Sequence, residues 1–185
     1  MNLFARLDEA TRTQGLSFLI IGGHAVNAHG FARFTRDLDL LICRTDVEKW
    51  LAALKTDGYT VKHDGGNFLQ LSATAKDAAP VDFMLVNEPT FLQMKAAATE
   101  VQIQDLSFLV PCLDHLLALK VHALKHGPSR RGYKDLVDVL SLVDANRINV
   151  RSDKFRALCD KYGDAKIYEQ ILDFGQDQGS GGATR

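Results

Sequence analysis

Three aspartates in the first half of the chain have the type and spacing of a metal site. Asp37 and Asp39 stand in the run DLDLLIC over residues 37–43, which predicts a strand. Alternate side chains of a strand share a face, so both carboxylates point the same way. Two adjacent carboxylates repel each other, and burying them is costly unless a divalent cation lies between them. Carboxylate oxygens are the ligands that Mg²⁺ prefers, so the pair predicts a magnesium site.

A third carboxylate and a glycine pair extend this pattern. Asp82 is the one charged residue of the apolar run PVDFMLV over residues 80–86, a predicted strand, and a shared metal would be its partner. Gly22-Gly23 separates the apolar run SFLII from a predicted short helix. Glycines let the backbone come close to a ligand, and a helix N-terminus favours phosphate. Together these features predict two-metal phosphoryl transfer, in which acids hold ions that clamp the attacking and leaving oxygens.

Each feature also has an ordinary explanation. An Asp-x-Asp pair occurs on solvated surface strands, a Gly-Gly pair is a common turn, and Asp82 can be an acid in a salt bridge. The order of the three on the expected elements favours the metal site. Two alternatives stay open. One is a non-catalytic protein that binds a nucleotide or a partner, and the other is a structural α/β domain whose acids are surface charges.

Hydrophobic periodicity and turn residues indicate the elements that must position these groups. They predict a first helix over residues 2–13, a hairpin about residues 64–67, and a mainly helical second half with long amphipathic segments. The fold class is therefore α+β or α/β, a small mixed sheet with flanking helices followed by a helical C-terminal half. The predicted organisation has three parts: a catalytic core over 1–88, a mainly helical part over 89–174 and a Gly/Ser-rich disordered tail over 175–185.

Composition narrows the classes of function. The 185 residues carry a formal net charge of −1, so no strong overall field draws the protein to nucleic acid, and a polyanionic ligand must be met by a local cluster. No stretch approaches the roughly 18 uninterrupted apolar residues of a membrane span. The first residues lack the apolar stretch of a signal peptide. The expected location is therefore the cytoplasm, with no membrane partner.

The motifs resemble those of the DNA polymerase beta-type nucleotidyltransferases. The shared pattern is an apolar residue with Gly-Gly, a spacer, Asp-apolar-Asp-apolar and a later strand acid, here Ile21-Gly22-Gly23, Asp37 to Leu40 and Asp82. The form R-x-T-x-D-L-D-L, with Arg33 and Thr35, is similar to the minimal nucleotidyltransferases. It is especially similar to the abortive-infection toxin group of toxin–antitoxin systems.

This resemblance implies the nucleotidyltransferase fold and transfer of a nucleoside monophosphate from a nucleoside triphosphate to an acceptor, with pyrophosphate leaving. The acceptor would be an RNA or tRNA end, a protein or a small molecule, and a toxin would have an antitoxin protein as partner. Asp37, Asp39 and Asp82 would hold two Mg²⁺ ions, for which Mn²⁺ can substitute. The implied nucleotide-binding residues are Gly22, Gly23, His24 (where many members have Ser or Thr), Arg33, Lys120, Lys134 and Asp135.

The second half of the chain carries the last three of these residues. Relatives in the toxin group have a K/R-K-D-x-x-D stretch on a helix beside the nucleotide, and Tyr133 to Asp138 (YKDLVD) resembles it. The resemblance implies that Lys120 and Lys134 neutralise the triphosphate and that Asp135 orients a basic group or the acceptor. The alternative is that the charges of this segment form i,i+4 pairs on an exposed helix.

Overall fold

The computed structural model describes residues 2–127 and 129–179, which form two compact units. The first unit comprises the chain up to Ala28 and Ala32–Cys112, and the second comprises His29–Phe31 and the chain from Leu113 onward. The first unit thus continues past residue 88, the end of the predicted catalytic core. The last helix runs to Gly179, so the first five residues of the predicted disordered tail are helical, and residues 180–185 lie outside the described residues.

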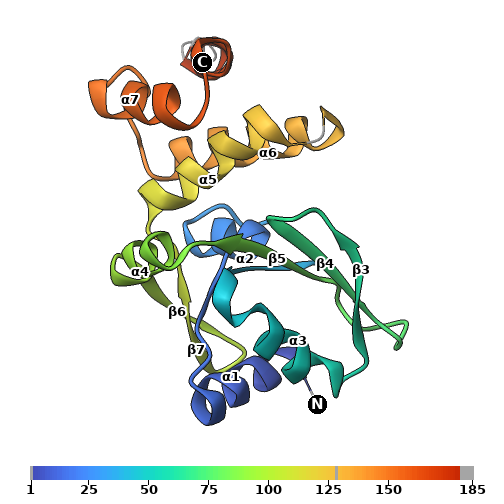
Figure 1. The fold of residues 1–185 in the computed structure, drawn as a ribbon. Coiled ribbons are helices and arrows are strands. Elements are labelled where there is room, and N and C mark those ends of the chain that lie inside the picture. The colour runs from blue at the N-terminus through green and yellow to red at the C-terminus, as the bar shows by residue number, and fades with distance from the viewer. Residues whose placement is uncertain (1, 128, 180–185) are drawn as a thin grey trace. The chain divides into compact units, whose positions relative to one another are not determined.

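The centre of the first unit is a mixed five-stranded sheet with the order β1-β2-β5-β4-β3. Strands β2 and β5 are parallel, whereas β1–β2, β4–β5 and β3–β4 are antiparallel. The predicted small mixed sheet is therefore confirmed, with β3 and β4 as the predicted hairpin (Figure 1). The strands are β1 (Phe18–Ile20), β2 (Leu38–Cys43), β3 (Tyr59–Asp64), β4 (Phe68–Ala73) and β5 (Val81–Val86).

Helices cover both faces of this sheet. Helix α2 (Gly22–Ala28) lies on one face, and α1 (Leu3–Gln14) and α3 (Val47–Lys55) lie on the other (Figure 1). Trp50 of α3 is fully buried, with its ring centroid 5.4 Å from that of Phe18 and 6.5 Å from that of Phe83. Burying such large aromatic side chains supplies much of the free energy that holds a helix onto a sheet. The α1/α3 face is therefore the structural core, which leaves the other face for a site.

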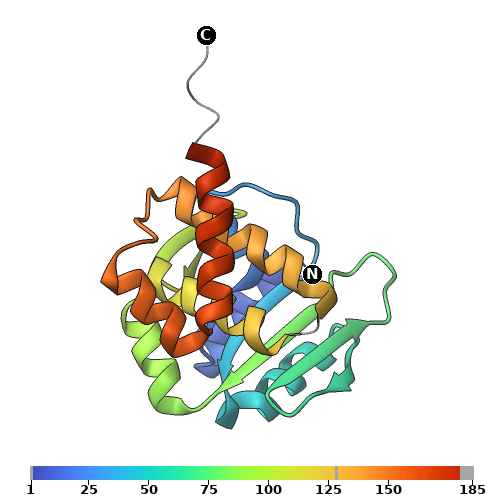
Figure 2. The same ribbon diagram turned by 90° about the horizontal axis from the view of Figure 1, so that it is seen from above.

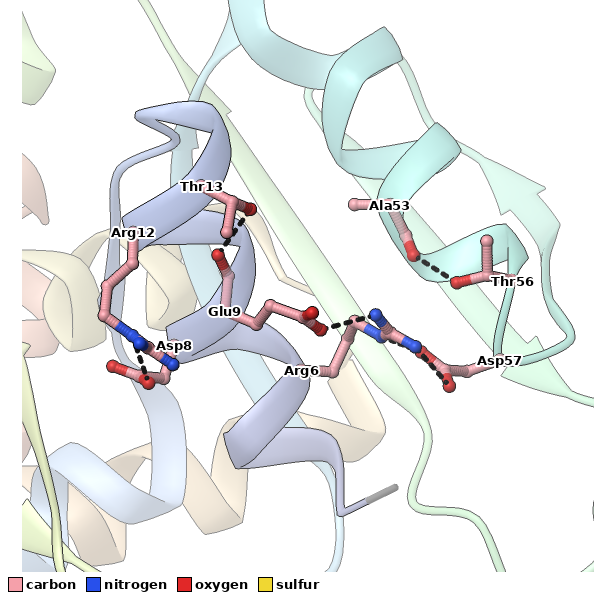
Figure 3. Close-up of polar contacts among 8 residues, drawn as sticks. All are labelled: Arg6, Asp8, Glu9, Arg12, Thr13, Ala53, Thr56 and Asp57. Carbon is pink, nitrogen blue, oxygen red and sulfur yellow. Dashed lines mark hydrogen bonds and ion pairs between the residues drawn. The ribbon is translucent and has the colours of Figure 1, made fainter.

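An ion-pair network joins α1 to the end of α3. Nε of Arg6 donates to Asp57 at 2.5 Å and Nη1 donates to Glu9 at 2.6 Å (Figure 3). The two carboxylates raise the pKa of the Arg6 guanidinium, chiefly through the hydrogen bond to Asp57. A cavity of about 240 Å³ lies between the two helices and is lined in part by Arg6, Ala10 and Ala53. Because α1 and α3 cover the core face, this cavity is separate from the face that carries α2.

The remaining elements of the first unit are α4 (Glu88–Ala96) and the hairpin of β6 (Thr99–Ile103) and β7 (Leu106–Val110). Asn87 caps α4 by accepting from the backbone N–H of Thr90 at 2.9 Å. Phe108 of β7 packs on Phe18, with centroids 5.8 Å apart. The hairpin thereby extends the core beside β1.

The second unit is helical, as the amphipathic segments predict. Its helices are α5 (Leu113–His126), α6 (Ser129–Ala145), α7 (Asp153–Tyr162) and α8 (Ala165–Gly179), and α8 lies across α5 and α6 (Figure 2). Leu117, Val139 and Leu142 are almost fully buried between them. Asn146, just after α6, donates to the carbonyl of His29 at 2.9 Å, which ties residues 29–31 to this unit.

No helix in the described part of the chain combines the length and apolar character needed to cross a membrane.

Candidate active site

Asp39 and Asp82 lie directly opposite each other on the parallel strands β2 and β5. The backbone N–H of Leu38 donates to the carbonyl of Pro80 at 3.0 Å, which fixes this register at the start of both strands. Partner residues of neighbouring strands carry their side chains on the same face, so the two carboxylates are neighbours. Asp82 is 4% exposed and Asp39 is half-buried. The sequence pattern thus indicated two acids that the sheet brings together.

Asp37 lies one residue before β2 begins, in a bend, and is half-buried. The predicted strand included this residue, whereas the ladder with β5 starts at Leu38. Its carbonyl faces the hydroxyl of Thr35 at 3.4 Å. Asp37 therefore precedes the Asp39–Asp82 pair along the chain, on backbone that the ladder itself does not hold.

The glycine pair forms the first turn of α2 and touches the motif that carries the acids. Gly22 has a φ of 60°, and a Cβ atom there would overlap Oδ2 of Asp39 and lie 2.5 Å from its Cγ. A Cβ atom at Gly23 would lie 2.5 Å from Oγ1 of Thr35 and 3.0 Å from Nη1 of Arg33. Both positions require glycine because side chains of the R-x-T-x-D-L-D segment occupy the space. The two sequence motifs therefore form one packed site, with α2 backbone against Asp39.

Asn27 is a site residue that the sequence motifs did not reveal. Its amide oxygen accepts from the backbone N–H of Arg33 at 2.9 Å, and its amide nitrogen donates to the carbonyl of Arg33 at 3.0 Å. This two-point contact holds the middle of the α2–β2 loop against the helix and places Arg33 beside Gly23. A single asparagine in the segment HAVNAHG gives no such signal, because an Asn in a helix usually faces solvent.

Arg33 and Arg36 differ in their surroundings although both flank the acids. The Arg33 guanidinium lies at Gly23, inside the site. Nη2 of Arg36 donates instead to the carbonyl of Lys76 at 3.2 Å, on the exposed loop before β5. Of the two cations, Arg33 is the one positioned beside the glycine pair, and its predicted contact with the nucleotide stays a prediction.

His24 is half-buried on α2, with its ring edge-on to Phe4 at a centroid separation of 5.7 Å. Burial lowers the pKa of His24. The negative charge of Asp39 partly opposes this effect, and the positive charge of Arg33 adds to it. The imidazole is therefore uncharged at neutral pH. It can offer a neutral hydrogen-bond donor beside the glycine pair, but it adds no positive charge for a triphosphate.

The acid pair fits a divalent cation that arrives with a triphosphate. In residues 2–127 and 129–179, no three His, Cys, Asp or Glu side chains form a group that could hold a metal ion by themselves. Mg²⁺ is usually held by one or two carboxylates together with substrate phosphates, and it keeps several waters. Asp39 beside Asp82 is a donor set of this kind.

Lys120 and Asp135 lie in the second unit and form a buried ion-pair cluster with Asp138. Nζ of Lys120 is 2.8 Å from Asp135 and 2.7 Å from Asp138, and the three side chains are 11%, 12% and 1% exposed. Burial lowers the pKa of Lys120, but the two carboxylates outweigh it, so the net shift is upward. Asp135 thus forms an ion pair with Lys120, and its predicted role at the nucleotide stays a prediction. The predicted role of Lys120 at a triphosphate stays a prediction, and its charge is already matched by two acids.

Lys134 stands next to Asp135 in sequence but on the other side of α6, where it is exposed. Asp135 and Asp138 point toward Lys120 in the interior of the unit. Lys134 and Asp138 therefore do not form the exposed i,i+4 ion pair that was the alternative interpretation of this segment. Of the three predicted residues of this half, Lys134 is the one whose ammonium is accessible to a ligand.

Comparison with known proteins identifies the architecture. A family model described as uncharacterised nucleotidyltransferase matches residues 1–176. No protein with a curated description matches the chain in sequence. A solved antigenic nucleotidyltransferase-like protein from Paracoccidioides brasiliensis is 16% identical with a TM-score of 0.55, over 92% of this chain and 87% of that one.

Two further similar structures are of proteins solved with an antibiotic or an adenylylated antibiotic bound. ANT(2'')-Ia in complex with adenylyl-2''-tobramycin is 14% identical with a TM-score of 0.57, over 95% of this chain and 97% of that one. The lincosamide adenylyltransferase LnuA with bound lincomycin is 19% identical with a TM-score of 0.54, over 76% and 93% of the two chains. At these identities the likeness concerns the fold, which is the one that the sequence motifs predict.

Proposed function

This chain belongs to the uncharacterised nucleotidyltransferase family, and from that premise we propose that it transfers a nucleoside monophosphate from a nucleoside triphosphate to an acceptor hydroxyl. The observation that carries the proposal is the register of Asp39 with Asp82, next to the tight packing of Gly22 on Asp39. Mg²⁺ is usually held by one or two carboxylates together with substrate phosphates, so two adjacent carboxylates favour a site for a metal-bound triphosphate.

In the proposed reaction, the oxygen of the acceptor hydroxyl attacks the α-phosphorus of the triphosphate. The bond from the α-phosphorus to its bridging oxygen breaks, and pyrophosphate leaves. The buried carboxylate of Asp82 takes the hydroxyl proton, which raises the nucleophilicity of the oxygen. The backbone of Gly22 and Gly23 holds the triphosphate, with Arg33 beside it. Mg²⁺ bound by Asp37, Asp39, Asp82 and the phosphates would supply charge neutralisation at the reacting centre.

The proposed acceptor is a small molecule with several hydroxyl groups. ANT(2'')-Ia and LnuA, which share the fold over most of this chain, are solved with an adenylylated tobramycin and with lincomycin. The balanced charge of the protein offers no broad attraction for a polyanion. An RNA end modified by a toxin, with an antitoxin as partner, is the second acceptor class, because the R-x-T-x-D-L-D-L segment resembles that group.

Label transfer tests the proposal. Purified protein is incubated with each α-labelled nucleoside triphosphate and Mg²⁺, in separate reactions with tobramycin, lincomycin, total tRNA or total protein. Label in one acceptor that disappears in the Asp37→Ala/Asp39→Ala double variant supports transfer and identifies the acceptor class. Mg²⁺-dependent binding of the triphosphate without transfer to any acceptor would replace the proposal with a non-catalytic nucleotide-binding protein.

A further inference from the structure

Polar side chains continue the line of Asp39 and Asp82 across the sheet onto β4 and β3. Gln70 of β4 is the cross-strand partner of Asp82, and His63 of β3 is the partner of Gln70. Because cross-strand partners share a face, His63, Gln70, Asp82 and Asp39 form one row across four adjacent strands. This polar row lies on the face opposite the aromatic core around Trp50.

A β-bulge is what brings His63 into the polar row. Val61 pairs with Leu71, and regular alternation would next set Lys62 against Gln70. The register shifts between Val61 and His63, so His63 takes that place. A bulge sets two residues of one strand against one residue of its partner, and here it brings an imidazole opposite Gln70 in addition to the neighbouring Lys62.

The glycine pair and Gln70 lie on opposite sides of the acids. Gly22 packs on Asp39 from the β1 side of the sheet, whereas Gln70 stands on the β4 side of Asp82. If the glycine backbone holds the triphosphate, as proposed above, the hydroxyl that gives its proton to Asp82 approaches from the β4 side. The inference therefore rests on the proposed function and adds the location of the acceptor.

The side chains on this side have the chemistry of a site for hydroxyl groups. The half-buried amide of Gln70 can both donate and accept, and the structure assigns it no hydrogen-bond partner among residues 2–127 and 129–179. Ser72 and Thr60, themselves cross-strand partners, add two hydroxyls on the same face. Together with the His63 imidazole, these side chains offer the amide and hydroxyl groups that form hydrogen bonds with hydroxyl groups.

We infer that the face of the β3–β4 hairpin formed by Gln70, His63, Ser72 and Thr60 binds the acceptor, and that the Gln70 amide holds its hydroxyl group beside Asp82. The acceptor class is a small polyhydroxylated molecule. Opposed residues of an antiparallel pair have Cβ atoms about 5 Å apart, which brings the Gln70 amide and the Asp82 carboxylate within reach of one hydroxyl. Gln70 is an acceptor-binding residue that no sequence motif indicated.

The test compares Gln70→Ala with Gln102→Ala, a matched change at an exposed glutamine on β6. Two quantities are measured for each protein. One is the KM for tobramycin in label transfer, and the other is the Kd of the α,β-methylene analogue of ATP by equilibrium dialysis with Mg²⁺. We expect Gln70→Ala to raise the KM by about fivefold or more, since one hydrogen bond contributes on the order of 1 kcal/mol. The Kd of the analogue should stay within about twofold, and Gln102→Ala should change neither.

Each other outcome overturns a distinct statement. An unchanged KM in Gln70→Ala, with active wild-type protein, removes Gln70 from the acceptor site and leaves the proposed function standing. A weaker Kd for the analogue assigns Gln70 to the nucleotide or to the fold. Label in tRNA and not in tobramycin overturns the small-molecule acceptor. Absence of transfer to any acceptor by the wild-type protein removes the proposed function, and this inference with it.

Discussion

Gly22 and Asp39 are in such close contact that no side chain fits at position 22 while the Asp39 carboxylate keeps its place. They stand 17 positions apart in the printed sequence, at the start of α2 and on β2. The backbone N–H of Ile21 donates to the carbonyl of Asp39 at 2.8 Å, which fixes this approach from the strand side. The packing of the α2 backbone on Asp39 is thus part of the site, and substitutions at these residues should change both activity and stability.

Gly22→Ala should abolish transfer and destabilise the first unit. The Cβ atom would displace the Asp39 carboxylate, and the φ of 60° is unfavourable for alanine, which together cost about 1–3 kcal/mol. Label transfer and urea unfolding measure the two effects. Gly15→Ala is the matched control, because Gly15 has a φ of 67° but nothing within 4 Å of its Cβ position. It should lose stability from backbone strain alone and keep its activity. Equal activity of both variants would contradict the proposed role of this contact.

Asp39→Asn should reduce transfer by about a hundredfold or more while the protein stays folded. Removing one carboxylate takes away several kcal/mol of charge stabilisation at the reacting centre, and each 1.4 kcal/mol is a factor of about ten in rate. Asparagine has nearly the shape of aspartate, so circular dichroism should show an unchanged fold. Asp77→Asn, on the exposed loop before β5, is the control and should behave as wild type. Full activity of Asp39→Asn would show that the mechanism is wrong.

Acidification should destabilise the protein in part through His24. Burial lowers the pKa of His24 in the folded state, so the unfolded chain binds the proton more readily. Its contribution to stability is present above the ordinary histidine pKa of about 6.5 and is lost as the pH falls through the lowered folded-state value. Urea unfolding at several pH values measures the free energy of unfolding, which should fall less on acidification for His24→Asn than for wild type. The same change at the exposed His63 is the control, and an undiminished loss in His24→Asn would point to another group.

Lys120→Met should destabilise the helical unit strongly. The change leaves Asp135 and Asp138 buried without their cation, and breaking a buried ion pair from one side costs about 3–5 kcal/mol. Chemical denaturation followed by circular dichroism measures the loss. Lys134→Met removes an exposed ammonium of α6 and should leave stability within about 0.5 kcal/mol of wild type. Restored stability in Lys120→Met/Asp135→Asn/Asp138→Asn would confirm that the loss of the Lys120 ammonium between the two acids causes the effect.

The local pattern of the sequence was sufficient for much of the fold and for the acids of the site. Apolar runs predict β2 and β5, the glycines before β4 predict the hairpin, and the amphipathic segments predict α5 and α6. These predictions succeed because strand and helix periods are properties of neighbouring residues. The Asp-x-Asp pair and the lone Asp82 were recognisable for the same reason, since an acid in an apolar strand is conspicuous in the sequence.

Only the tertiary structure decided which of these residues meet. The register of β2 with β5 makes Asp39 and Asp82 partners, and a bulge in β3 makes His63 the partner of Gln70. A one-residue change of register would turn every side chain to the other face, and no local pattern fixes that choice. Likewise, the sequence shows that Lys120 is a cation, but only the packing of α5 on α6 shows that it is buried between two carboxylates. Residue type determined the chemistry available, and long-range packing determined which groups can act together.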